Sequence, residues 1–332
     1  MASIEITSPH RPRTLPSLRQ IAESAFPIIA IYFLMWVVYG LVEPSALSLY
    51  SIEALFNNSL PLMLAAAGAT FVILQGGFDL SVAGVISLAN VVVAVMPMEG
   101  PLGGVANLAM VVAIGLLVGA VNGFVVAYLR IQAIAATLAT MIMCKGAALL
   151  ILKAPGGFVS DFMAYELTAS FFGIVPIAGV IAVAIMLFWA VFRSTNTGRS
   201  LIAVGQDENA AALSGIDVAR TRFTSFLWAG AFYGAAGYML AAQTSTGNPN
   251  GGDPFLLLSF AAVALGGTAF GGGRGGVTAS LFGAATLMLM QKVLFAVGVS
   301  SFYTGVVQGA IMILAVLFSA FVLAVTRQRK SR

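Results

Sequence analysis

The chain is dominated by long apolar segments separated by short polar turns, and this pattern restricts it to a membrane. Val111–Ala120 and Ile311–Val325 are apolar on every face of a helix. Hydrophobic residues make up 60% of the 332 residues and charged residues only 8%, whereas a soluble domain carries roughly 25% charged residues. A water-soluble fold would have too little polar surface to cover itself, so lipid is the expected solvent.

The segments predict an all-α polytopic membrane protein with about ten transmembrane helices. A spanning helix needs about 20 apolar residues, whereas a barrel would alternate polar and apolar positions in stretches of roughly 10 residues. The ten predicted segments are residues 26–43, 58–75, 80–97, 102–128, 131–152, 168–192, 223–243, 255–270, 276–297 and 303–325. Eight spans are the alternative, if two short segments are re-entrant.

Basic residues indicate the orientation of the spans, because Lys and Arg accumulate on the cytoplasmic side of membrane proteins. With the N-terminus inside, the cytoplasmic side receives Arg11, Arg13, Arg19, Arg130, Arg193, Arg199, Arg220, Arg222, Arg274, Arg327, Arg329, Lys330 and Arg332, which are thirteen of the sixteen basic residues. Both termini are therefore predicted to be cytoplasmic. The expected organisation is a tail over residues 1–25, a transmembrane domain over 26–325 with a cytoplasmic loop at 193–222, and a basic tail over 326–332.

The composition also argues against several functional classes. The net charge of +4 is explained by basic residues beside spans, so nucleic acid is not an expected partner. The chain has one cysteine, Cys144, and one histidine, His10. A Cys/His metal site or a Cys–His nucleophile pair is therefore not expected, and no metal ligands or catalytic residues are predicted.

The cytoplasmic loop at 193–222 is the longest polar stretch inside the molecule and contains charges of both signs. Within it, Gln206–Leu213 predicts a short helix, with Asp207 and Glu208 favouring its N-terminus and Ser214-Gly215 ending it. An isolated helix of about eight residues is not stable in water. Packing must therefore hold it, either against its own membrane domain or as a rigid ridge in the groove of a cytoplasmic partner.

Three separated stretches resemble one family, the permease subunits of sugar-type ABC importers of the ribose/galactose/xylose group. The first stretch, Gln75-Gly76-Gly77-Phe78-Asp79-Leu80-Ser81-Val82, is similar to that family's "GGxDLSVG" element, with Ala83 preceding Gly84. The second, Gly198–Ile216, resembles its coupling segment, and the third, Val263–Gly275, resembles its "VLGGTSxxGGxG" element. The resemblance covers about residues 55–325, with the motifs in matching order.

The resemblance implies one transmembrane subunit of an ATP-driven importer in the inner membrane of a bacterium. Its implied partners are a cytoplasmic ABC ATPase, which would hold the ATP and Mg²⁺ that this chain does not bind, an extracytoplasmic solute-binding protein, a second permease subunit and the lipid bilayer. The residues implied to couple to the ATPase are Gly205, Asp207, Glu208, Asn209, Ala210, Ala211, Ala212, Ser214, Gly215 and Ile216.

Two glycine-rich stretches are predicted to lie near the cytoplasmic surface. Residues 266–276 lack the Lys-Ser/Thr pair of a phosphate-binding loop, so they are interpreted as a flexible turn between spans. Around 76–81, Asp79 or Ser81 can cap the helix that follows; the alternative is a broken helix whose end lines a polar cavity. The candidate inner gate and helix break comprises Gly76, Gly77, Asp79, Ser81, Gly266 and Gly267.

Polar residues inside the spans are candidates for the solute path, because lipid-facing positions disfavour them. The candidates are Asn90, Asn122, Thr137 and Gln308, and Gln132, Thr140 and Gln243 also fit. Amides and hydroxyls suit a neutral polyhydroxylated solute, although for any single one of them an interhelical hydrogen bond is the favoured role. Lys145 is costlier to bury and must either reach the membrane surface or pair with a neighbouring group. Residues 247–253 are rich in turn-forming residues and are predicted to form an outer loop.

Gly115, Gly119 and Gly123 are spaced for close helix packing, either within the subunit or at a subunit interface. The rival functions are a branched-chain amino-acid permease and an ion-coupled secondary transporter. The second would require membrane-embedded carboxylates, for which only Asp79 qualifies. No paired residues suggest an intramembrane enzyme.

Overall fold

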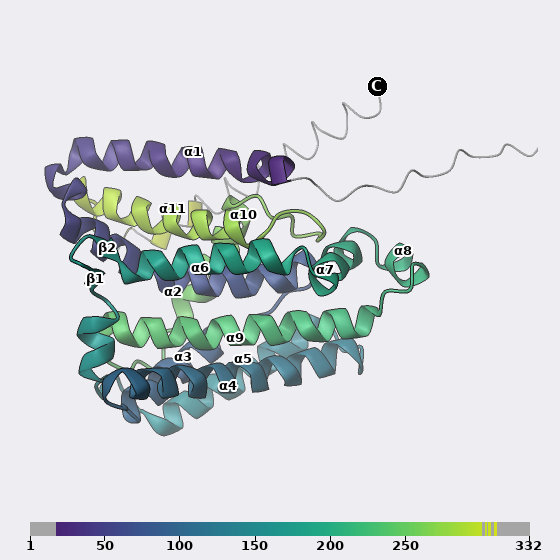
Figure 1. Ribbon diagram of the computed structural model, residues 1–332. Coiled ribbons are helices and arrows are strands. Elements are labelled where there is room, and N and C mark those ends of the chain that lie inside the picture. Colours follow the sequence, from purple (N-terminus) through teal and green to yellow (C-terminus); the bar gives the residue numbers. More distant parts are fainter. Residues whose placement is uncertain (1–17, 301–302, 304, 307–308, 311–332) are drawn as a thin grey trace, which may run out of the picture.

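A computed structural model of the chain describes residues 18–300, 303, 305–306 and 309–310, with the side chains from Phe26 onward. The long helices run alongside one another in a single bundle (Figure 1). Two short helices, α7 and α8, project at one end of the bundle, and a two-stranded hairpin lies at the other. These two ends are called the α8 end and the hairpin end below.

The helices within the described residues are α1 (Leu18–Val42), α2 (Leu49–Leu74), α3 (Val82–Val95), α4 (Gly100–Ala127), α5 (Ala133–Ile151), α6 (Ile177–Phe192), α7 (Asn196–Gln206), α8 (Glu208–Leu213), α9 (Val218–Thr244), α10 (Asp253–Leu265) and α11 (Val277–Ala296). A short 3-10 helix, η1 (Pro44–Leu47), and a π-helical turn, η2 (Phe162–Glu166), join longer elements. The strands β1 (Ser170–Phe171) and β2 (Val175–Pro176) pair antiparallel, with Ser170 opposite Pro176.

Nine of the ten predicted segments coincide with α1 to α6 and α9 to α11, and the tenth, 303–325, lies almost wholly outside the described residues. The sixth was predicted to begin at 168, but α6 begins at Ile177 because the β1–β2 hairpin occupies the residues before it. Helix α2 begins at Leu49 rather than 58, where the Ser48 hydroxyl caps its first turn.

Within the described residues, four helices are long and apolar enough to cross a membrane: α2, α4, α5 and α11. A fifth span is possible if α6 and α7, which meet at 79°, are taken together. Three shorter apolar helices, Phe26–Val42, α3 and α10, fall below the length of a full span. The chain is thus a helical membrane protein, and α3 and α10 are helices that begin within the bundle rather than at its end.

The centre of the bundle is built on α9, which packs against α2, α3 and α4. Glycines bring α4 and α9 into backbone contact: a Cβ on Gly115 would lie 2.0 Å from the Gly230 carbonyl oxygen, and one on Gly119 would lie 2.3 Å from that of Phe226. The glycine spacing in α4 therefore serves helix packing within this chain, which was the first of the two interpretations, since small residues allow such approach.

Two helix pairs repeat the same arrangement in opposite directions. Helix α2 runs toward the α8 end, is interrupted over residues 75–81, and continues into the short helix α3. Helix α9 runs toward the hairpin end, is interrupted over residues 245–252, and continues into the short helix α10. The two long helices pack on each other, α3 packs on α9, and α10 packs on α2, so the two pairs interlock at the core.

Candidate coupling site at the α8 end

Helix α7 is stabilised by Thr195, which caps its N-terminus, and by burial of its apolar face. The Thr195 hydroxyl accepts the Gly198 N–H at 3.2 Å, and Leu201 and Val204 are buried. The sequence reasoning missed this helix and assigned its last residue, Gln206, to the short helix that follows. The missed signal was the buried apolar face, which extends toward α2 and α9.

Helix α8 matches the predicted short helix except at its first two residues, because Gln206 ends α7 and Asp207 is the N-cap. Asp207 is the N-cap, and its Oδ1 atom accepts the Ala210 N–H at 3.0 Å. The helix ends where the Gly215 N–H bonds to the Ala212 carbonyl and the Ile216 N–H bonds to that of Ala211. Gly215 has a φ of +83°, the left-handed conformation that favours glycine at this position.

Most of α8 is exposed. Among its six residues only Ala211 is buried, and the Leu213 side chain is 90% exposed. Asp207, Glu208, Asn209, Ala210, Ala212 and Ser214 are also exposed. The helix is therefore held at its two caps and along one narrow contact, and it presents a mixed apolar and polar ridge at the end of the bundle.

Three separated motifs meet behind this ridge. The Gly273 N–H donates to the Leu74 carbonyl oxygen at 2.8 Å, which joins the loop before α11 to the end of α2. Gly205, near the end of α7, lies so close that a Cβ there would be 1.8 Å from the Leu74 oxygen and 2.5 Å from the Gly273 nitrogen. Gln206 adds a hydrogen bond from its amide to the Gly273 oxygen at 3.3 Å. We call these four residues the backbone junction.

The paired glycines of the candidate inner gate end two helices in the same way. The Gly76 and Gly77 N–H groups bond to the Ile73 and Val72 carbonyls at the end of α2. At the end of α10, Gly267 and Thr268 repeat this pattern, and Gly266 is the C-cap. Gly76 and Gly267 both have positive φ, +85° and +75°, as this termination requires. Each glycine pair thus stops a helix at the α8 end.

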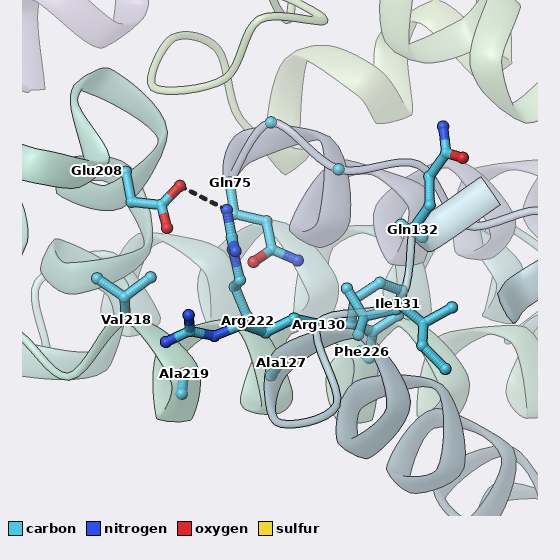
Figure 2. A pocket seen from close by; sticks show the side chains of 14 residues that line it. Gln75, Ala127, Arg130, Ile131, Gln132, Glu208, Val218, Ala219, Arg222 and Phe226 are labelled. Carbon is cyan, nitrogen blue, oxygen red and sulfur yellow. Dashed lines mark hydrogen bonds and ion pairs between the residues drawn. The ribbon is translucent and has the colours of Figure 1, made fainter. Parts of the chain in front are cut away.

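A cavity of about 510 Å³ opens between α8, α9 and the end of α2. Figure 2 shows Glu208 of α8 facing Arg222 of α9, with Gln75 beside them. The Glu208 Oε2 and Arg222 Nη2 atoms are 2.6 Å apart. Arg130 and Gln132 line another wall of the cavity. A polar cavity therefore borders both the exposed ridge and the first helix break.

Asp79 and Ser81 are buried in a polar network at that break. Asp79 Oδ1 accepts the backbone N–H and the hydroxyl of Ser81, at 2.9 and 2.5 Å. Ser81 makes no capping bond to α3; its hydroxyl instead accepts the Asn122 amide at 3.0 Å. The Asp79 Oδ2 atom is buried without a hydrogen-bond partner among the described residues. The predicted side-chain cap of α3 is therefore not formed, because Asp79 closes a turn onto the N-cap residue Ser81 and does not reach the first turn of the helix.

The candidate path residues are buried rather than gathered around one opening. Asn122 and Thr137 belong to the same network, in which Thr140 donates to Asn122 Oδ1 at 2.8 Å and the Leu80 N–H donates to the Thr137 hydroxyl at 3.0 Å. Asn90 lies elsewhere, where its Oδ1 accepts the Asn248 N–H at 2.6 Å. Gln308 lies outside the described residues.

Some of the residues that build this site gave no signal in the sequence. Leu74 is one apolar residue among many, and only its contact with Gly205 and Gly273 shows its place in the junction. Arg222 was counted only for its charge, although it is the ion-pair partner of Glu208. No three His, Cys, Asp or Glu side chains are grouped as metal ligands in the part of the chain that the structure describes.

Comparison with known proteins places these features in a family. The family model described as "Branched-chain amino acid transport system / permease component" matches residues 51–316, a range that includes all three motifs. The chain belongs to this permease family. This membership confirms the prediction of a transport subunit rather than an enzyme.

Curated relatives lie in the sugar-permease branch that the motifs resemble. The ribose import permease protein RbsC of Bacillus subtilis is 32% identical over 298 residues, covering 88% of this chain and 91% of the relative. The L-arabinose transport system permease protein AraH of Escherichia coli is 28% identical, over 97% and 98% of the two chains. The galactose/methyl galactoside import permease protein MglC of Haemophilus influenzae is 29% identical, over 86% and 92%. No solved structure matches the chain significantly.

Proposed function

We propose that the chain is the membrane permease of an ABC importer that carries a monosaccharide of the ribose, galactose or xylose kind into a bacterial cell. In this proposal it crosses the cytoplasmic (inner) membrane ten times with both termini inside. A separate ATPase subunit binds ATP and Mg²⁺, a solute-binding protein delivers the sugar, and a second permease subunit completes the pathway. The relatives that import ribose, arabinose and galactose support the sugar class over a branched-chain amino acid.

The observation that carries the coupling part of the proposal is α8. An exposed helix of six residues is not stable by itself, and Leu213 is an apolar side chain left 90% exposed at its end. A groove on the ATPase would cover this ridge. A movement of α8 would be transmitted to Gly205 in the backbone junction, and from there to the end of α2 and to the loop before α11.

The proposal is tested by replacing Asp207–Leu213 with a Gly/Ser linker of equal length. The expected variant inserts in the membrane but loses both ATPase co-purification and sugar uptake. A point variant, Leu213→Asp, should weaken co-purification without affecting folding, because the side chain is exposed. The matched control is Phe172→Asp, which changes a fully exposed apolar residue at the hairpin end and should leave co-purification unchanged.

Three results would refute the proposal. Normal ATP-dependent uptake by the linker variant would show that α8 does not couple the chain to its motor. Uptake of labelled leucine in place of ribose, arabinose, galactose and xylose by the purified complex would favour the amino-acid alternative. Uphill transport by the chain without companion subunits, on an ion gradient, would favour a secondary transporter.

A further inference from the structure

An ion pair joins α5 to the first residue of α10. The Lys145 Nζ atom lies 2.8 Å from Asp253 Oδ1 and 2.9 Å from Oδ2. The sequence left Lys145 without a partner and placed Asp253 in an outer loop. Both side chains remain partly open at the protein surface, with 28% and 44% of their areas exposed.

Along the length of the bundle, the ion pair lies well away from the hairpin end. Lys145 is six residues from the end of α5 at Ile151, which is about 9 Å at 1.5 Å per residue. Helix α10 begins equally deep. The Gly252 N–H donates to the Ser87 hydroxyl at 3.0 Å, and Ser87 is eight residues from the end of α3 at Val95, a rise of about 12 Å.

The segment before α10 descends along α3 as non-helical backbone. Gly247 lies against Ala94, near the outer end of α3, and Gly252 lies against Ala83, near its beginning. Between them, the Asn248 N–H is held by Asn90. Backbone of this kind is tolerated at membrane depth only where protein buries it or where it borders a water-filled cavity. Asn250, in the middle of this segment, is exposed.

Lipid is a poor neighbour for this surface. If lipid covered the exposed parts of these two charged side chains, they would lose their water and gain no protein contacts in exchange. For this reason, charged residues in membrane proteins face the protein interior or a water-filled cavity. Helix α5 packs mainly on α3 and α4 among the helices, and both charged side chains keep exposed area, so the described part of this chain leaves the surface beside the pair partly open.

We propose that Lys145, Asp253 and Asn250 line the water-filled solute cavity partway across the membrane, and that the ion pair exchanges hydrogen bonds with the hydroxyls of the passing sugar. This inference rests on the proposed function, with the second permease subunit closing the far side of the cavity. An adjacent ammonium and carboxylate offer donors and acceptors without net charge, which suits a neutral polyhydroxylated solute and not an ion.

Water access at this depth is measured first, in the complete complex and in a Cys144→Ala background that removes the single cysteine. Asn250→Cys should react with a membrane-impermeant methanethiosulfonate at least tenfold faster than Leu117→Cys, an exposed apolar position in the middle of α4. Saturating sugar-loaded binding protein should slow the reaction at Asn250→Cys. Equal, slow reaction of the two variants would overturn the proposal, because lipid or protein would then cover the surface.

The role of the pair is measured next. The double variant Lys145→Gln/Asp253→Asn should lower sugar uptake at least tenfold, or raise its KM, while the ATPase still co-purifies. The reversed pair, Lys145→Asp/Asp253→Lys, keeps an ion pair at this position but exchanges the places of the hydrogen-bond donor and acceptor. It should therefore be expressed like the unchanged protein but should not restore sugar uptake. Full uptake by the reversed variant would show a purely structural pair and overturn the proposal. Loss of ATPase co-purification would instead count against the coupling role of α8.

Discussion

Gly205→Ala is the smallest change that tests whether the three motifs meet as a rigid junction. The new Cβ atom would lie 1.8 Å from the Leu74 oxygen and 2.5 Å from the Gly273 nitrogen, whereas ordinary contact begins at 3.4 Å. Both neighbours are backbone atoms and cannot rotate aside. The end of α7 would therefore be forced away by up to about 1.6 Å, and the hydrogen bond between Gly273 and Leu74 would be broken at the same time, because the new methyl group points at both of its atoms.

The expected cost in free energy combines these two effects. Forcing a methyl group into a packed site costs about 1–3 kcal/mol, and loss of a backbone hydrogen bond adds about 1 kcal/mol. A total of about 2–4 kcal/mol corresponds to a population change of tenfold or more, at 1.4 kcal/mol per factor of ten. Sugar uptake by the reconstituted complex should therefore fall at least tenfold, and the thermal midpoint of the purified chain should also fall.

Gly271→Ala is the matched control, because Gly271 lies in the same loop as Gly273 and has nothing within 4 Å of its added Cβ. Its uptake and thermal midpoint should equal those of the unchanged protein. If Gly205→Ala also behaved in this way, α7 would not be in contact with α2 and the loop before α11, and the junction would have no part in coupling.

Two further changes test the packing and the buried network. Gly115→Ala should lower the thermal midpoint, because its Cβ would lie 2.0 Å from the Gly230 oxygen, whereas Gly146→Ala, with nothing within 4 Å, should not; equal midpoints would contradict the contact between α4 and α9. Asn122→Leu should destabilise the chain by about 1–3 kcal/mol, because it removes two hydrogen bonds of the buried network, to Ser81 and from Thr140; denaturant unfolding that matched the unchanged protein would contradict this role.

Sequence periodicity and composition predicted the helices better than their contacts. The apolar runs marked α4, α5 and α11 almost to their ends, because a membrane span must be apolar over its whole length. The Asp207 cap and the Gly215 stop of α8 were also predictable, since each depends on local hydrogen bonds. Helix α7 was missed because the stretch was interpreted as a polar loop, although Leu201, Ile202 and Val204 fall on one face of a helix.

Long-range pairing was the part that the sequence could not supply. Lys145 and Asp253 are 108 residues apart, and no local pattern relates them. The same holds for the contact of Gly205 with Leu74. Asp253 was assigned to an outer loop because proline and glycine surround it, a reasonable reading of turn chemistry. The missing information was that Ser87 and Asn90 of α3 draw that loop into the bundle.

Helix α3 is attached to both interruptions of the core at once. Its first residue follows the break at 75–81, and its Ser87 and Asn90 side chains hold the break at 245–252. Sliding or tilting of this one helix would therefore strain both interruptions at the same time. Neither interruption would be free to rearrange alone, so a movement that begins at the α8 end would reach the hairpin end through α3 itself.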